Sequence, residues 1–135
     1  MAAPEPRPYT LVAELTYRCP LRCPYCSNPT DWARHEDALA TEDWLRVFRE
    51  AEDLGVVQLN LTGGEPLLRD DLEALVAGAR KRELYTNLIT SGVPLEKERL
   101  RALREAGLDN VQVSVQDVVA EDSDRIAGMR VRRLR

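Results

Sequence analysis

The sequence predicts an α/β fold, the N-terminal part of a partial (β/α) TIM-like barrel, with about four parallel strands and intervening helices. Strand-like segments begin near residues 56, 84 and 110, at the spacing of a βαβ unit, so consecutive strands should be parallel and joined by right-handed crossovers. Apolar and polar residues alternate along these segments, which gives the sheet one apolar and one polar face. A polar inner face beneath a helix-covered apolar outer face is typical of an open barrel that holds a polar ligand.

Each helix and turn has its own local signal. Thr41 is the expected N-cap of the first helix, which has Glu42 and Asp43 in its first turn and ends at Gly55. Gly-Gly-Glu-Pro at 63–66 predicts a turn after the second strand. The expected strands span 10–16, 56–62, 84–90 and 110–116, and the expected helices span 42–54, 70–82 and 95–106. A further helix barely begins after the last strand.

The polar face of the sheet favours a barrel over a doubly wound sheet. A doubly wound sheet has helices on both faces, so its strands should be apolar throughout. Here Glu14, Asn60 and Asn87 belong to the polar face, where they are expected to face the lumen as ligand contacts or as hydrogen-bonded fillers.

The length sets the domain organisation. A closed barrel needs roughly 200 residues or more, whereas this chain has 135. We expect a proline-containing tail at 1–9, an incomplete core at 10–128 and a basic tail at 129–135. The basic tail resembles a truncation or frameshift end; the alternative is a solvated basic terminus.

Composition and charge exclude several classes of partner. The formal net charge is −4, so no global positive field exists to hold nucleic acid or an anionic membrane. The sequence shows neither an export signal nor a long apolar run, so we expect a cytoplasmic protein without a membrane anchor.

The three cysteines predict a metal centre. Cys19, Cys23 and Cys26 lie within eight residues, and an odd, clustered set does not suit a disulfide framework. Three thiolates can hold an iron–sulfur cluster while leaving one iron open to a substrate or cosubstrate. The alternative is a zinc site, for which His35 would have to supply the fourth ligand.

Cys-x3-Cys-x2-Cys after the first strand and Gly-Gly-Glu-Pro after the second resemble the radical S-adenosylmethionine (radical SAM) superfamily. The wider strings at 13–29, 63–67, 85–92 and 124–128 resemble one family of its SPASM subgroup, the pyrroloquinoline quinone (PQQ) maturases known as PqqE. The resemblance covers about residues 9 to 128.

The resemblance implies a [4Fe–4S] cluster and S-adenosyl-L-methionine (SAM) as cofactors. Cys19, Cys23 and Cys26 match the cluster ligands, and Tyr25 matches a position near the adenine, unless it only packs on the loop. The resemblance and the chain's own chemistry assign the remaining contacts to the methionyl and ribose groups of SAM: Gly63 and Gly64 through their backbone, Glu65 as a charge or a structural anchor, and Ser91, Ser114 and Gln116 at strand ends, where ordinary capping is the alternative.

The implied activity is an oxidoreductase reaction that joins a glutamate side chain to a tyrosine ring in a precursor peptide, PqqA. The implied partners are the peptide chaperone PqqD and an electron donor such as flavodoxin. The family also has a C-terminal extension with further cysteines, which this sequence lacks, so we expect the short chain to be inactive. The alternatives are another SPASM-type peptide maturase and a small zinc-binding interaction module.

Overall fold

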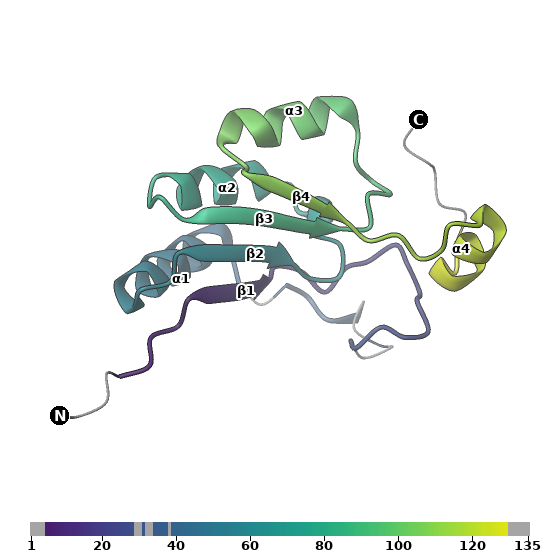
Figure 1. The fold of residues 1–135 in the computed structure, drawn as a ribbon, viewed down its shortest axis with the longest axis horizontal. Coiled ribbons are helices and arrows are strands. Elements are labelled where there is room, and N and C mark those ends of the chain that lie inside the picture. The colour runs from purple at the N-terminus through teal and green to yellow at the C-terminus, as the bar shows by residue number, and fades with distance from the viewer. Residues whose placement is uncertain (1–4, 29–30, 32–33, 38, 130–135) are drawn as a thin grey trace.

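A four-stranded parallel sheet forms the centre of the molecule (Figure 1). The structure is a computed structural model that describes residues 5–28, 31, 34–37 and 39–129. The strands are β1 (Thr10–Glu14), β2 (Gln58–Thr62), β3 (Tyr85–Thr90) and β4 (Asn110–Val113), and they lie in the order β1-β2-β3-β4. All three pairings are parallel, which confirms the predicted α/β class.

Helices connect the strands. They are α1 (Thr41–Leu54), the short 3₁₀ helix η2 (Pro66–Leu68), α2 (Leu72–Arg80), α3 (Lys97–Ala106) and α4 (Ala120–Ala127). Because the strands follow one another in chain order, right-handed crossovers place α1, α2 and α3 on the same face of the sheet. None of the helices in the described ranges is long and apolar enough to cross a membrane.

The two faces of the sheet differ as predicted. On the helix-covered face, Leu59, Leu61 and Leu88 are completely buried against side chains from the helices, among them Phe48 and Leu75. Burial of these apolar side chains is the main force that holds the helices on the sheet.

The opposite face carries a row of amide side chains. The Asn87 side chain donates to Asn60 Oδ1 at 3.1 Å and accepts from Asn110 Nδ2 at 2.8 Å. These bonds cross three neighbouring strands, and Gln58 adds a bond to Asn60 at 3.2 Å. Asn60 and Asn87 are therefore hydrogen-bonded to each other on the open polar face.

Several predicted boundaries are wrong by a few residues, and the start of α1 shows why. Thr41 is its first residue and Ala40 is its N-cap. The Thr41 hydroxyl donates to Asp71 at 2.5 Å, while the Asp43 carboxylate accepts from the Ala40 amide at 3.1 Å. The Thr41 hydroxyl, which the sequence assigned to capping, therefore forms a tertiary hydrogen bond instead. The C-terminal end agrees, since Gly55 has a left-handed backbone there.

The last helix is more complete than predicted. α4 has acidic residues in its first turn, Glu121 and Asp122, and ends at Gly128 in a left-handed conformation, both of which favour a helix here. In Figure 1 it lies beyond the carboxyl ends of the strands. The predicted basic tail spans 129–135, and all of it except Met129 lies outside the described residues.

Candidate functional site

The carboxyl end of β1 leads directly into the cysteine loop, residues 17–28. The Leu15 amide donates to the Thr62 carbonyl at 2.8 Å, so the chain stays beside β2 for one residue beyond the strand. It then leaves the sheet at the edge where the carboxyl ends of parallel strands meet. This is the edge at which parallel α/β proteins place ligands.

The turn at Gly63–Gly64 holds the start of the cysteine loop. The Gly64 amide donates to the Thr16 carbonyl at 2.8 Å, and the Glu65 amide donates to the Arg18 carbonyl at 2.7 Å. Gly63 has a φ of +152°, and a Cβ there would lie 2.7 Å from the Thr16 carbonyl oxygen. A Cβ on Gly64 would lie 2.2 Å from the Arg18 oxygen. Both glycines therefore allow the turn to lie against the loop without a side chain between them.

A cavity of about 450 Å³ opens between the cysteine loop, the turn and the ends of β3 and β4. All but one of the cluster ligands and SAM contacts expected from the resemblance line it. These are Cys19, Cys23, Tyr25, Cys26, Gly63, Gly64, Ser91, Ser114 and Gln116. Residues separated by as many as 97 positions in the sequence thus meet in one place, as the parallel topology predicts.

The three cysteines are free thiols that face this common cavity. Burial raises the pKa of the Cys19 thiol, and the Glu65 carboxylate and the other two cysteines raise it further. Burial and the adjacent Cys26 raise the pKa of Cys23 as well. Within the described ranges, no three Cys, His, Asp or Glu side chains are spaced as ligands of one ion. Binding of a metal would therefore require the thiols to move closer together and would release protons.

The donor set fits a [4Fe–4S] cluster better than zinc. Three soft thiol ligands come from one loop and line one cavity, as cluster ligation requires. His35 instead packs its ring against Tyr17, with 6.0 Å between the ring centroids, and it does not line the cavity. The structure therefore does not bring the fourth ligand of the zinc hypothesis to the cysteines.

Glu65 is the expected site residue that does not line the cavity. Its side chain is only 1% exposed and lies beneath the turn. Oε1 accepts from Thr90 Oγ1 at 2.6 Å and from the Leu67 amide at 3.1 Å. Oε2 accepts from the Ser91 amide and hydroxyl. Of the two roles left open by the sequence, this geometry favours the structural anchor.

The other expected contacts differ in how firmly they are held. The Ser91 hydroxyl is fixed by Glu65, whereas Tyr25 lines the cavity with a side chain that is 63% exposed. Ser114 donates its amide to the Thr90 carbonyl at 2.8 Å, which continues the pairing of β4 with β3 past the end of the strand.

Neither the place of Arg22 in the cavity wall nor the contact of the cysteine loop with α4 was identified from the sequence. Arg22 lines the cavity, and its amide donates to the Ala127 carbonyl at the end of α4, at 2.9 Å. A Cβ on Gly128 would lie 3.1 Å from the Arg22 Cβ. The end of α4 thus packs on the cysteine loop. The two segments are far apart in the sequence, so no local sequence pattern predicts this contact.

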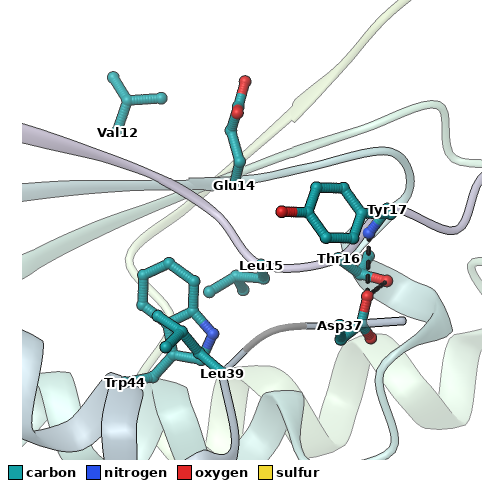
Figure 2. Close-up of a pocket in the computed structure, with 8 residues that line it drawn as sticks. All are labelled: Val12, Glu14, Leu15, Thr16, Tyr17, Asp37, Leu39 and Trp44. Atoms are coloured by element: carbon teal, nitrogen blue, oxygen red, sulfur yellow. Dashed lines mark hydrogen bonds between the residues drawn. The ribbon is translucent and has the colours of Figure 1, made fainter. Parts of the chain in front are cut away.

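A second cavity, of about 490 Å³, lies along the free edge of β1 (Figure 2). Glu14 and Val12 point to one side of the strand, and Trp44 and Leu15 lie on the other side, toward α1. Glu14 therefore borders this second cavity and not the cavity of the cysteines.

Comparisons with known proteins show which family the chain resembles. The Radical SAM superfamily matches residues 13–134. A PqqA peptide cyclase from Granulibacter bethesdensis is 51% identical over 129 residues, which cover 96% of this chain and 34% of that protein. The chain thus spans about a third of the length of that relative.

Solved structures of similar fold come from Streptococcus suis SuiB. The structure of SuiB bound to S-adenosylmethionine is similar to this chain with a TM-score of 0.76 and 24% sequence identity. The match covers 93% of this chain and 27% of the SuiB chain. For SuiB bound to its precursor peptide SuiA, the TM-score is 0.78 and the identity 25%, and the match covers 92% of this chain and 28% of the SuiB chain.

Proposed function

The chain belongs to the radical SAM superfamily, and from that premise we propose that it is the cluster- and SAM-binding part of a PqqA peptide cyclase. The reaction would join a glutamate side chain to a tyrosine ring of the precursor peptide PqqA by a carbon–carbon bond. The observation that carries the proposal is the cavity that brings Cys19, Cys23 and Cys26 together with the turn at Gly63–Gly64.

Each group in the cavity has a role that its chemistry supports. The three thiolates would hold the [4Fe–4S] cluster, and the backbone of Gly63 and Gly64 would accept from the methionyl ammonium of SAM. When bound, the cluster supplies the electron that cleaves SAM and so starts hydrogen-atom abstraction from the peptide. Tyr25 would contact the adenine from the cavity wall.

Strand ends supply the remaining contacts. Ser91, Ser114 and Gln116 face the cavity from the carboxyl ends of β3 and β4 or just beyond them, where they would bind the ribose and carboxylate of SAM. Glu65 would act indirectly, because its carboxylate fixes Ser91 and places negative charge near Cys19.

The proposal extends to partners and location. PqqA would be the substrate, PqqD its chaperone and a flavodoxin the electron donor, all in the cytoplasm. The peptide-bound SuiB structure supports a precursor peptide as the class of substrate. A different precursor peptide is the alternative substrate.

Anaerobic reconstitution followed by metal analysis tests the cofactor assignment. We expect about four irons per chain and an electron paramagnetic resonance (EPR) signal that shifts when SAM is added. One zinc without iron would support the interaction module instead. When supplied with PqqA, PqqD, SAM and reductant, the full-length relative should give a peptide that has lost one hydrogen from each of the two joined residues. If this chain replaces its matching segment in that relative, the product should still form.

A further inference from the structure

Arg69 is the most buried cation in the described part of the chain, with 6% exposure. It follows η2, four residues after Glu65, and does not line the cavity of the cysteines. Its guanidinium binds Asp71 in a bidentate pair, with Nε to Oδ1 and Nη2 to Oδ2 both at 2.7 Å. Such a fork has a fixed geometry, so Arg69 is held in one orientation.

The third nitrogen of Arg69 binds the segment that leads to the cysteines. Nη1 donates to the Leu15 carbonyl at 2.8 Å and to the Leu39 carbonyl at 3.2 Å. Leu15 is the first residue after β1, and Leu39 lies just before α1. Asp71 also accepts from Thr41, the first residue of α1. One guanidinium therefore joins the exit of β1 to the starts of α1 and α2.

Asp37 extends this network to the residues next to Cys19. Its Oδ1 accepts from Thr16 Oγ1 at 2.7 Å and from the Tyr17 amide at 2.9 Å, as Figure 2 shows. Its Oδ2 lies 3.7 Å from Arg18 Nη2 and 4.0 Å from Arg69 Nη1. We call Arg69, Asp71 and Asp37 the Arg69 clamp.

The clamp and the turn together fix every residue from Leu15 to Arg18. Arg18 donates to the Leu68 carbonyl at 2.8 Å, and its own carbonyl accepts from the Glu65 amide. Cys19 comes directly after this held segment and is half-buried, whereas Cys26, at the far end of the cysteines, is exposed. Among the described residues, the clamp contacts the segment that precedes Cys19 and makes no contact with Cys26.

We propose that Arg69, acting through Leu15 and Asp37, is a positioning residue that directs the sulfur of Cys19 into the cavity. A buried ion pair could instead serve only the stability of the fold. The two roles differ in what they predict for the individual cysteines, because loss of the clamp should free Cys19 before it affects Cys26.

Alkylation of the three cysteines tests this selectivity on the chain before metal is added. Rates with iodoacetamide are measured at a single pH by peptide mass spectrometry. Arg69→Met should raise the rate at Cys19 about fivefold and leave Cys26 within about twofold, because local opening exposes the sulfur. Arg69→Lys, which keeps the charge without the fork, should lie between. Arg82→Met is the control. Arg82 forms an ion pair with Glu52, with 2.8 Å between the nitrogen and the oxygen, and takes no part in the clamp.

Unfolded variants are recognised because all three cysteines then react at their rates in urea. In that case the comparison passes to Asp37→Asn, which preserves the size and shape of the side chain, and to Arg69→Lys, which preserves its positive charge. The proposal would be overturned if, in folded variants, the ratio of the alkylation rate at Cys19 to that at Cys26 equals the ratio in the unsubstituted chain. Unfolding of these conservative variants too would overturn it, since the clamp would then hold the fold and not the loop.

The cluster gives an independent readout, which rests on the proposed function. Reconstituted Arg69→Met should retain less iron and show a broadened EPR signal, with partial rescue in Arg69→Lys. An unsubstituted chain that takes up no iron would refute the proposed function but leave the alkylation comparison valid.

Discussion

Oε2 of Glu65 accepts both hydrogen bonds that Ser91 offers, from its amide at 2.9 Å and from its hydroxyl at 2.5 Å. Oε1 accepts from Thr90 and from the Leu67 amide. A buried side chain at the end of β2 thereby fixes the end of β3. All four partners are donors, so both oxygens must act as acceptors.

Glu65→Gln should therefore destabilise the chain although it preserves the shape of the side chain. The amide nitrogen of glutamine would face donors on one side and leave them unsatisfied in a buried position. We expect the free energy of unfolding to fall by about 2–4 kcal/mol, measured by urea denaturation. Glu52→Gln, at an exposed pair with Arg82, should cost about 0–1 kcal/mol. Equal midpoints for the two variants would contradict the anchoring role.

Gly64→Ala should disturb the cysteines as well as any bound SAM. A side chain at Gly64 is expected from the sequence to occupy the space of the methionyl group of SAM. The structure adds a contact with the cysteine loop, since the new Cβ would lie 2.2 Å from the Arg18 oxygen and 3.1 Å from the Cys19 Cβ. Reconstituted iron per chain should therefore fall by half or more, by about the same factor as SAM binding.

Gly78→Ala is the matched control for that substitution. Its Cβ would meet only the end of the flexible Leu45 side chain, far from the cysteine loop. Iron content should remain at the unsubstituted level. Full iron in Gly64→Ala together with lost SAM binding would show that the turn faces the ligand alone.

Cys23→Ala should abolish cluster assembly. Two thiolates cannot hold the three irons that this loop would ligate, and His35 packs on Tyr17 instead of facing the cavity. Iron analysis and the visible spectrum after anaerobic reconstitution measure the loss. Ser27→Ala, an exposed change in the same loop, should leave both unchanged. Unchanged iron in Cys23→Ala would argue against the cluster.

The sequence predicted those parts of the molecule that depend on local periodicity. Leu59 and Leu61 alternate with Asn60, and this alone identifies the buried and open faces of β2. The cysteines and the turn at Gly63–Gly64 follow consecutive strands, and parallel pairing then brings them together. Local pattern and topology are sufficient at these positions.

The parts that could not be predicted depend on contacts between distant residues. Arg69 binds a carbonyl 54 positions earlier in the sequence, and Arg22 binds the end of a helix more than 100 positions later. An arginine in a loop gives no sign of burial until its partners are in place. The role of Glu65 stayed open for the same reason, since Ser91 lies 26 positions away.

The pairing of Asp71 with Arg69 should make stability depend on pH in the acid range. Hydrogen bonds from Arg69, and more weakly from Thr41, lower the pKa of Asp71 from 3.8 to about 2. Because the folded pKa lies below the unfolded one, this stabilisation is complete above about pH 4 and is lost as the pH falls toward 2. The full shift corresponds to about 2 kcal/mol, reduced to about 1–2 kcal/mol by partial solvent screening. Urea midpoints should therefore fall more steeply between these pH values in the unsubstituted chain than in Asp71→Asn. Glu52→Gln, at an exposed pair with Arg82, is the control and should follow the unsubstituted curve. Parallel curves for the unsubstituted chain and Asp71→Asn would show that the ion pair does not control acid stability.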